Sequence, residues 1–298
     1  MLNTELHWPK SYSESPENYL PGNNLYEEFL ESSQGFAPKA RIHFQVGNFT
    51  VKTADRLAEL QSAMKLRYSV FRSEFGIPET ADQCDMDRYD LHSDHLLILD
   101  NLTNLTIGTY RLSASNFANQ YYSETEFDLT EVLKLPGNKL EVGRACVHPN
   151  YRNGAIINLL WRGLITYAKL HDVRYLFGCS SIRTIEPRLA AILLRGLEDR
   201  GFATQLHQVN PKPNYLIPNF DWHYQTTQYR ALHLDRDMWD FWVPPLLKSY
   251  FKAGARVLGQ PVLDLNFNCI DFFTLLDLNC VSPQFERKFE SWCAPSTT

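Results

Sequence analysis

The sequence predicts an α/β protein with a mixed, twisted central sheet flanked by helices. The 298-residue chain is 44% hydrophobic and 21% charged, which supplies enough apolar material for a full core. Between residues 139 and 202 the pattern runs strand, glycine-containing loop, helix, strand, helix, which is typical of an α/β unit with a crossover connection. Two strands joined by a short turn precede this unit. The sheet is therefore expected to combine antiparallel and parallel pairs.

The first half of the chain is expected to contain an arm, a helix and four strands. Residues 1–40 are rich in Pro, Asn, Ser, Gly and Tyr without periodicity, which indicates an extended or poorly ordered arm. Residues 41–51 alternate like a strand. Thr53 is expected to cap a helix whose apolar side chains recur three and four residues apart up to Phe75. Further strands are predicted at 95–100, 105–113 and 139–147.

The second half continues with helices at 156–171 and 187–202 on either side of an apolar strand at 174–181. Beyond residue 211 the pattern changes. It predicts an irregular stretch at 210–225, one short helix within 237–255, and closing strands within 262–278. We therefore divide the chain into an arm (1–40), one domain (41–280) and a tail (281–298).

Charge, cysteine spacing and hydropathy argue against several classes of protein. Lys and Arg minus Asp and Glu give 29 − 34 = −5, so nothing points to a nucleic-acid partner. The six cysteines form no C-x-x-C pair, so we predict no metal site and no redox dithiol, but reduced thiols, with Cys146 and Cys179 in the core. The chain begins without a signal-peptide pattern, and no apolar run reaches the ~18 residues of a membrane span. We expect a cytoplasmic protein, with peripheral attachment to the inner face of the membrane left open.

Three arginines stand in otherwise apolar helix or strand patterns, at Arg67, Arg111 and Arg144. An acidic stretch containing Asp85, Asp87 and Asp90 lies between the first helix and the strand at 95–100. A calcium site is not expected there, because the Gly and the final Glu of an EF-hand loop are missing. A buried arginine requires a partner, since an unpaired buried charge is very costly. Acid–arginine pairs are therefore expected, either as structural pairs or as a site that holds a zwitterion.

The strand at 139–147 contains Glu141 and Arg144. In a regular strand, residues three apart point to opposite faces of the sheet. Both side chains can face one pocket only if the strand bulges between them, and Gly143 is where a bulge is tolerated. A regular strand and a bulged strand fit the periodicity equally well.

The loop before the helix at 156–171 contains Arg152, Asn153 and Gly154. Backbone N–H groups at a helix N-terminus bind anions, and these residue types suit that purpose. No G-x-S-x-G, Walker A or G-x-G-x-x-G motif is present, which argues against a serine hydrolase, a P-loop enzyme and a dinucleotide-binding protein.

Taken in order, these segments resemble the GNAT acyltransferase superfamily. The matching segments are Arg67-Tyr-Ser-Val-Phe71, Asp85-x-Asp87-x-Tyr-Asp90, Asp94-His95-Leu-Leu, Gly108-Thr-Tyr-Arg111-Leu, Glu141-Val-Gly-Arg144-x-Cys-Val-His-Pro, Tyr151-Arg152 and Leu-x-Gly178-Cys-Ser-Ser. Their order is similar to that in LuxI-type autoinducer synthases and N-acyl amino acid synthases. The fuller resemblance is to the ornithine–acyl-carrier-protein N-acyltransferases, and it covers roughly residues 42–280.

The resemblance implies a fold and a reaction. Residues 41–280 would form a GNAT-like acyltransferase domain with a splayed strand pair, at 139–147 and 174–181, and a C-terminal extension. The enzyme would move a long-chain acyl group, with 3-hydroxylation left open, from the phosphopantetheine of acyl carrier protein to the amine of ornithine, giving a lyso-ornithine lipid. No permanently bound cofactor is implied. Loops that bind CoA pyrophosphate typically read Arg-x-x-Gly-x-Gly or Ala, whereas this chain reads Arg152-Asn-Gly154-Ala-Ile-Ile and lacks the second small residue, which fits a donor carried by a protein.

The resemblance also marks site residues. Glu141 is the expected base, acting directly or through a water, with His95 as the alternative, and backbone N–H groups of 141–147 would bind the oxyanion. The residues expected to bind the amino acid are Arg67, Asp87, Asp90, Arg111 and Arg144, with Arg111 or Arg144 on the carboxylate and Asp87 or Asp90 on the ornithine ammonium. Those expected to bind pantetheine or the carrier protein are Val147, Arg152, Gly154, Arg183 and Arg188, with Arg162 as a further docking candidate. The first helix and Trp161 would contact the acyl tail.

Two other functions stay open on the sequence alone. One is a related acyl-carrier-protein-dependent acyltransferase that uses another amine, as in N-acyl amino acid or acyl-homoserine lactone synthesis. The other is a non-catalytic protein that binds acyl carrier protein or lipid. The intact Glu141, Arg144 and Asp87 argue against loss of catalysis.

Overall fold

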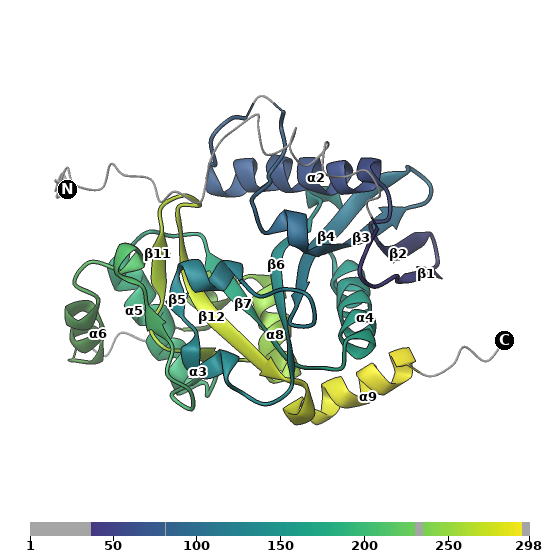
Figure 1. Ribbon diagram of the computed structural model, residues 1–298. Coiled ribbons are helices and arrows are strands. Elements are labelled where there is room, and N and C mark those ends of the chain that lie inside the picture. Colours follow the sequence, from purple (N-terminus) through teal and green to yellow (C-terminus); the bar gives the residue numbers. More distant parts are fainter. Residues whose placement is uncertain (1–36, 81, 230–234, 294–298) are drawn as a thin grey trace.

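The computed structural model describes residues 37–80, 82–229 and 235–293. Within these ranges, ten strands form one mixed sheet and helices cover both of its faces (Figure 1). The strands of the main sheet are β1 His43–Val46, β2 Phe49–Thr53, β3 Asp94–Asp100, β4 Leu105–Ala114, β6 Asn138–Val147, β7 Val173–Ile182, β8 Ala203–Thr204, β10 Arg256–Leu258, β11 Val262–Asp264 and β12 Cys269–Asp277. A second, two-stranded sheet pairs β5 Phe127–Asp128 with β9 Asn210–Pro211. Most of the expected arm, residues 1–36, lies outside the described residues.

The helices follow the predicted order, with additions. They are α2 Leu57–Phe75, α3 Thr130–Leu133, α4 Gly154–Leu170, α5 Pro187–Asp199, α6 Phe220–Tyr229, α7 Arg236–Trp242, α8 Pro245–Ala253 and α9 Pro283–Cys293. Short 3-10 helices are η1 Asp90–His92, η2 Tyr122–Thr125, η3 Pro149–Tyr151, η4 Pro213–Tyr215 and η5 Leu278–Cys280. None of the helices in the described ranges is both long and apolar enough to cross a bilayer.

The strands of the main sheet run in the order β1-β2-β3-β4-β6-β7-β12-β10-β8, and β11 pairs with β12. The pairs β6–β7 and β8–β10 are parallel and the other pairs are antiparallel. The parallel pair β6–β7 is connected through α4, which is the crossover expected for such a unit. The mixed sheet predicted from the sequence is confirmed.

Two local predictions were wrong at the N-terminal edge of the sheet. The expected single strand 41–51 is a hairpin, because Gly47 takes a left-handed φ of 57° and turns the chain between β1 and β2. Thr53 does not cap the first helix. It ends β2, where its hydroxyl donates to the Ala40 carbonyl and accepts from the Ile42 amide, and the helix begins after Arg56 without a side-chain cap.

Proline and packing account for two further differences. The single short helix expected within 237–255 is divided into α7 and α8 by Pro244, whose extended backbone ends one helix before the next begins. The stretch expected to be irregular contains α6, whose Phe220 is buried among side chains of α5 and β12. Tertiary packing therefore orders a segment whose local pattern is weak.

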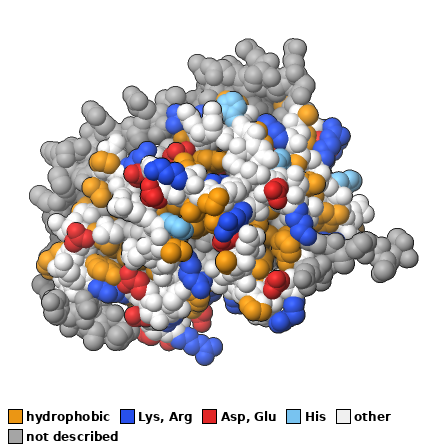
Figure 2. Space-filling view, turned by 60° about the horizontal axis from the view of Figure 1, so that its bottom comes forward, with side chains coloured by type: hydrophobic (Ala, Val, Ile, Leu, Met, Phe, Trp, Pro, Cys, Tyr) orange, Lys and Arg blue, Asp and Glu red, His pale blue; other side chains and the backbone are white. Residues whose placement is uncertain are grey.

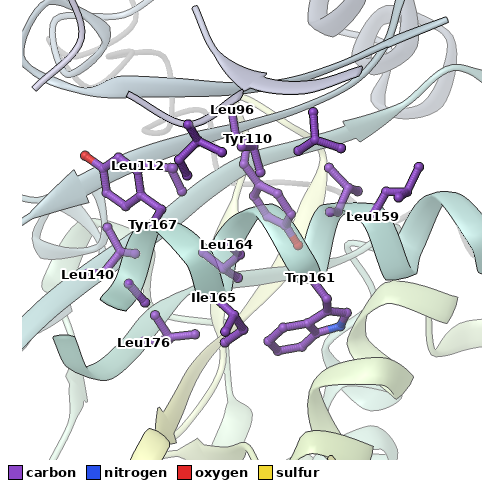
Figure 3. Close-up of a cluster of buried hydrophobic side chains, with 14 of the residues drawn as sticks. Leu96, Tyr110, Leu112, Leu140, Leu159, Trp161, Leu164, Ile165, Tyr167 and Leu176 are labelled. Carbon is purple, nitrogen blue, oxygen red and sulfur yellow. The ribbon is translucent and has the colours of Figure 1, made fainter. Parts of the chain in front are cut away.

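The larger core lies between α4 and one face of the sheet. Side chains of α4 pack against Tyr110 and Leu112 of β4 and Leu140 of β6, as Figure 3 shows. Because side chains alternate along a strand, Arg111, between Tyr110 and Leu112, points to the opposite face. That opposite face is covered by α2, by the acidic loop that leads into η1, and by η2.

Strands β6 and β7 pair over only part of their length. Their parallel register runs from Asn138 opposite Val173 to Glu141 opposite Phe177, and beyond that point the two strands diverge. Gly178 lies at the point of divergence, where its backbone packs directly against the Val142 carbonyl. The splayed strand pair that the sequence resemblance implied is therefore present.

The C-terminal residues after β12 pack back onto the domain. Phe285 of α9 is buried, and its ring lies 4.7 Å from the Trp161 ring of α4. The division of the chain at residues 40 and 280 stays a prediction.

We expect Gly178→Ala to lower the stability of the fold. An added Cβ would lie 2.3 Å from the Val142 carbonyl oxygen, so β6 and β7 would have to move apart. The expected cost is about 1–3 kcal/mol, measured by denaturant unfolding. Gly154→Ala is the matched control, because an added Cβ there meets no atom within 4 Å. Equal stability of the two variants would contradict a close approach at Gly178.

Candidate active site

Three arginines and three aspartates form a buried ion-pair network on the face of the sheet opposite α4. Arg67 of α2 donates through Nε to Asp85, at 2.6 Å, and through Nη1 and Nη2 to Asp90, at 2.8 and 3.0 Å. Arg111 donates to both oxygens of Asp87 at 2.7 Å. All of these side chains are buried. The network pairs three positive charges with three negative ones. This pairing offsets the free-energy cost of removing the guanidinium groups from water.

A β-bulge brings Arg144 into this network. The β4–β6 register shifts between Thr109 and Arg111, so that one extra residue of β6 is accommodated. The left-handed residue is Arg144, with a φ of 52°, and not the adjacent Gly143. Arg144 consequently points to the same face as Glu141 and donates through Nη2 to Asp87 at 2.8 Å. Of the two strand geometries left open by the sequence, the bulged one is present, displaced by one residue.

Arg111 keeps two donors that have no partner. Its Nη1 binds Asp87, whereas its Nε and Nη2 make no hydrogen bond although both atoms are buried. The missing side chain of Gly143 leaves room above them, since an added Cβ would lie only 3.6 Å from Nη2. Nε and Nη2 form the edge of a guanidinium group that binds a carboxylate through two parallel hydrogen bonds. The side chain therefore offers a ready carboxylate site.

Glu141 is held by η2. Its Oε2 accepts from the Tyr122 amide at 2.9 Å, and its Oε1 accepts from the amide and the hydroxyl of Ser123 at 2.7 and 2.6 Å. The side chain is buried, and burial raises the pKa of the Glu141 carboxyl although Arg111 and Ser123 act to lower it. Glu141 therefore positions η2 and also carries a carboxylate of increased basicity.

His95 is enclosed in the network, away from open space. Its Nε2 lies 3.3 Å from the Asp90 carbonyl oxygen and 3.9 Å from Asp90 Oδ1. Burial lowers the pKa of His95 to about 4, so its ring is neutral near pH 7. It does not line the cavity described below. This placement does not fit the alternative base considered on the sequence.

A cavity of about 930 Å³ passes through the gap between β6 and β7. On the face of the network it is lined by Arg111, Glu141 and Arg144, and by Val70, Phe71 and Phe75 of α2. On the face of α4 it is lined by apolar side chains, among them Trp161, Leu164, Leu276 and Phe285. Because Arg111 and the α4 contacts lie on opposite faces, the cavity connects the two sides of the sheet.

The mouth of the cavity on the α4 side carries four basic side chains, of which Arg152 is paired with Glu74 and Lys248 with Asp240. Arg152, Lys248, Lys252 and Lys288 line it, together with Gly154 at the start of α4. On the face turned forward in Figure 2, hydrophobic side chains lie among both basic and acidic side chains. Basic side chains around an apolar channel suit a donor that combines phosphate with an acyl chain.

The loop before α4 is itself hydrogen bonded. Asn153 Oδ1 accepts from the Ala155 and Ile156 amides at 3.0 and 3.1 Å, so these amides are capped by the protein. Arg152 donates through Nε to the Val147 carbonyl at 3.2 Å and forms an ion pair with Glu74. An anion at this helix end would replace the Asn153 cap.

The other arginines predicted to dock a carrier protein lie outside the cavity lining. Arg183 and Arg188 are exposed next to the end of β7 and in the first turn of α5. Arg162 of α4 stacks on the Phe44 ring at 4.6 Å. The lysines of α8 and α9, which do line the cavity, were missed because their segments gave no motif.

A second acidic cluster was also missed. Glu126, which follows η2, Asp264 of β11 and Asp271 of β12 are all buried. With Cys179 or Cys269 they form two groups in which three potential ligand atoms lie within 4.8 Å of one another. The signal was available, because Asp271 stands in an apolar strand pattern, as the three arginines do.

Most of this chain is similar in sequence to known proteins. The family model described as "Acetyltransferase (GNAT) domain" matches residues 66–162. An L-ornithine N(alpha)-acyltransferase of Brucella abortus (strain 2308) is 31% identical over 261 residues, which cover 81% of this chain and 88% of that protein. The enzyme of the same name from Rhizobium meliloti (strain 1021) is 30% identical over 266 residues, covering 84% and 86%.

Among solved structures, a CoA-dependent acyl-homoserine lactone synthase aligns with a TM-score of 0.44 and 15% identity, covering 80% of this chain and 84% of that one. An N-acyl amino acid synthase from uncultured soil microbes aligns with a TM-score of 0.44 and 9% identity, covering 80% and 93%.

Proposed function

Because this chain belongs to the L-ornithine N(alpha)-acyltransferase family, we propose that it transfers a long-chain acyl group from a thioester donor to the α-amine of L-ornithine. Membership of the family confirms two predictions made from the sequence, the GNAT-like α/β fold and the acyltransferase class of enzyme. The product would be a lyso-ornithine lipid. The donor would be the phosphopantetheine thioester of acyl carrier protein.

The observation that carries this proposal is the cavity through the gap between β6 and β7. It joins a buried, unpaired guanidinium edge at Arg111 on one face of the sheet to an apolar channel with a basic mouth on the other. A transferase that joins a fatty acyl group to an amino acid needs these two environments to meet at one point. A protein that only binds lipid has no need for the polar half.

The donor would enter from the basic mouth. Arg152 and Lys252 would contact its phosphate or the acidic carrier protein, since both line the mouth. The pantetheine arm would run along the β6–β7 gap, past Val147 and Gly154. The acyl tail would lie against Trp161, in the channel between α4 and α8, or reach Phe71 of α2 through the gap.

The acceptor would bind on the opposite face, with its carboxylate on Nε and Nη2 of Arg111. Of the two arginines considered on the sequence, Arg111 fits better, because Arg144 Nη2 already binds Asp87 and its Nε lies 3.6 Å from Asp85. Asp87 and Asp90 are occupied by arginines and do not fit as ligands of the ornithine ammonium. Arg67 is enclosed by Asp85 and Asp90 and would act by holding the network together.

The reaction itself requires a neutral amine. The ammonium form of the amino acid gives its proton to Glu141, directly or through a water, and the freed electron pair attacks the thioester carbonyl carbon. The carbon–sulfur bond then breaks as the amide forms, and the thiolate takes up the second proton that the attacking nitrogen releases. Beyond Glu141, the backbone amides of β6 that point toward β7 are not paired with that strand. These amides, within residues 142–147, would stabilise the oxyanion.

We predict that Arg111→Lys raises the KM for ornithine about 10- to 100-fold, with little change in the KM for the donor. Lysine keeps the positive charge that Asp87 requires but removes the paired Nε and Nη2 donors, and hydrogen bonds to a charged group contribute about 1.5–3 kcal/mol. Steady-state kinetics with each substrate varied in turn measures the effect. Equal increases in both KM values would contradict the assignment of the carboxylate to Arg111.

We predict that Glu141→Gln lowers kcat by about 10²- to 10⁴-fold, as expected for loss of a general base. Ser123→Ala is the matched variant, because it removes one hydrogen bond to the same carboxyl group but keeps the carboxylate. That hydrogen bond lowers the pKa of Glu141, so its loss raises the pKa further and moves the acidic limb of the kcat–pH profile to higher pH. A purely structural role for Glu141 would lower the activity of both variants in proportion to their loss of stability, without a shift of the profile.

The proposed function is tested by incubating the protein with acyl carrier protein thioesters or acyl-CoA and a panel of amino acids, followed by lipid mass spectrometry. We expect acyl-ornithine, formed more efficiently from the carrier protein. Lys252→Glu should raise the KM for the carrier protein, whereas the distant Lys134→Glu should not. If no amine gives a product, the protein would instead be a non-catalytic protein that binds acyl carrier protein or lipid. If another amine is preferred, the enzyme would catalyse a related acyl transfer.

A further inference from the structure

Among the described residues, three buried carboxyl groups on the acceptor side of the cavity are in no ion pair. Glu126 is fully buried, and Asp264 and Asp271 are 1% and 2% exposed. The neighbouring Asp85, Asp87 and Asp90 are neutralised by Arg67, Arg111 and Arg144. Among the described residues, no ion pair is formed by Glu126, Asp264 or Asp271. Since buried carboxylates require compensation, this cluster either holds protons or receives a cation from outside.

Two atoms of the cluster have no hydrogen-bond partner. Asp271 Oδ1 and Glu126 Oε1 are both buried and unpartnered. Three other oxygens of the cluster accept hydrogen bonds: Glu126 Oε2 from the Cys179 thiol at 3.3 Å, Asp264 Oδ1 from the Asn266 backbone amide at 2.8 Å, and Asp264 Oδ2 from the Tyr122 hydroxyl at 3.5 Å. Asp264 and Asp271 line the cavity. The unpartnered Asp271 oxygen therefore belongs to a side chain that faces the space where the acceptor would bind.

We propose that Asp271, Asp264 and Glu126 form the subsite for the side-chain ammonium of the acceptor, so that the enzyme selects a diamino acid over a neutral amino acid. This inference rests on the proposed function, in which the acceptor carboxylate binds Arg111. It assigns to β11, β12 and the end of η2 the role that the sequence had given to Asp87 and Asp90.

The position of the cluster relative to Arg111 fits such a substrate. Tyr122 joins the two sites: Arg111 Cζ lies 5.4 Å from its ring centre, and its hydroxyl donates to Asp264 Oδ2 at 3.5 Å. One subsite thus lies beside the Tyr122 ring and the other at its hydroxyl group. In ornithine, the α-amine is attached to the carbon between the carboxylate and the side chain. It would therefore lie toward Glu141 and the β6–β7 gap.

Electrostatics supports an ammonium. Burial raises the pKa of Glu126 well above its ordinary range and raises the pKa of Asp264, and burial together with the nearby Asp264 raises the pKa of Asp271 to about 6. An ammonium group bound among these carboxyl groups would interact favourably with their ionised forms and lower their pKa values.

The test compares L-ornithine with L-norvaline, which has the same carbon chain but no side-chain amine. We expect the wild type to prefer ornithine in kcat/KM by about 100-fold or more, because a site built for a polar group is left unpaired by the analogue. Asp271→Asn and Asp264→Asn should reduce this ratio at least about tenfold while norvaline turnover is retained. Norvaline turnover also reports that the variants fold. Glu131→Gln removes an exposed carboxylate on α3 as the matched control and should leave the ratio unchanged.

Several results would overturn the subsite. The first is a wild-type enzyme with the same kcat/KM for ornithine and norvaline. The second is a set of variants that lose turnover of both amino acids equally. The third is a purified protein that contains a stoichiometric metal ion on which turnover depends. Calorimetric titration with ornithine separates this inference from the proposed function. Binding that requires Asp271 without acyl transfer would refute the function alone, whereas acyl-ornithine formation without discrimination would refute the subsite alone. Neither binding nor transfer would refute both.

Discussion

The neutralisation of buried charge on one face of the sheet is the constraint on which the rest of the site depends. Arg67, Arg111 and Arg144 come from a helix and two strands, and each is held by a carboxylate of the loop that leads into η1. Without the arginines the aspartates would be unpaired, and without the aspartates α2 could not pack against β4 and β6. The network therefore fixes the positions of the helix, the loop and the two strands together.

The bulge in β6 follows from this constraint and prepares the chemistry. The left-handed backbone conformation is strained for any residue other than glycine. Arg144 is held in it by its hydrogen bond to Asp87 and its contacts with the rings of Tyr122 and Phe267. The same bulge shifts the register of β6 against β4, close to the point where β6 separates from β7. The separated strands leave the cavity open on both faces. The charged half and the apolar half of the cavity can therefore meet where the acyl transfer would take place.

The two acidic clusters show how identical side chains acquire different roles. Asp87 and Asp90 form ion pairs with arginines, and the positive charges of these arginines lower the pKa of both carboxyl groups. Asp264 and Asp271 lack such partners, and burial raises the pKa of both. The difference lies in which segments fold next to them. On the sequence the first cluster was the more conspicuous, because its aspartates are close together along the chain, whereas the second is assembled from residues 126, 264 and 271.

The mixed sheet, the crossover helix α4, the family and the polar residues that need partners when buried could all be predicted from the sequence. Those features are local: periodicity, glycine and proline positions, and charges set in apolar runs. Four other features became visible only in the folded chain: residues 41–51 turn back at Gly47, Arg144 is the bulged residue, Glu141 binds η2, and His95 does not line the cavity. The physical reason is that burial, pairing and pKa depend on distances between segments far apart in the chain, which no spacing along the sequence contains.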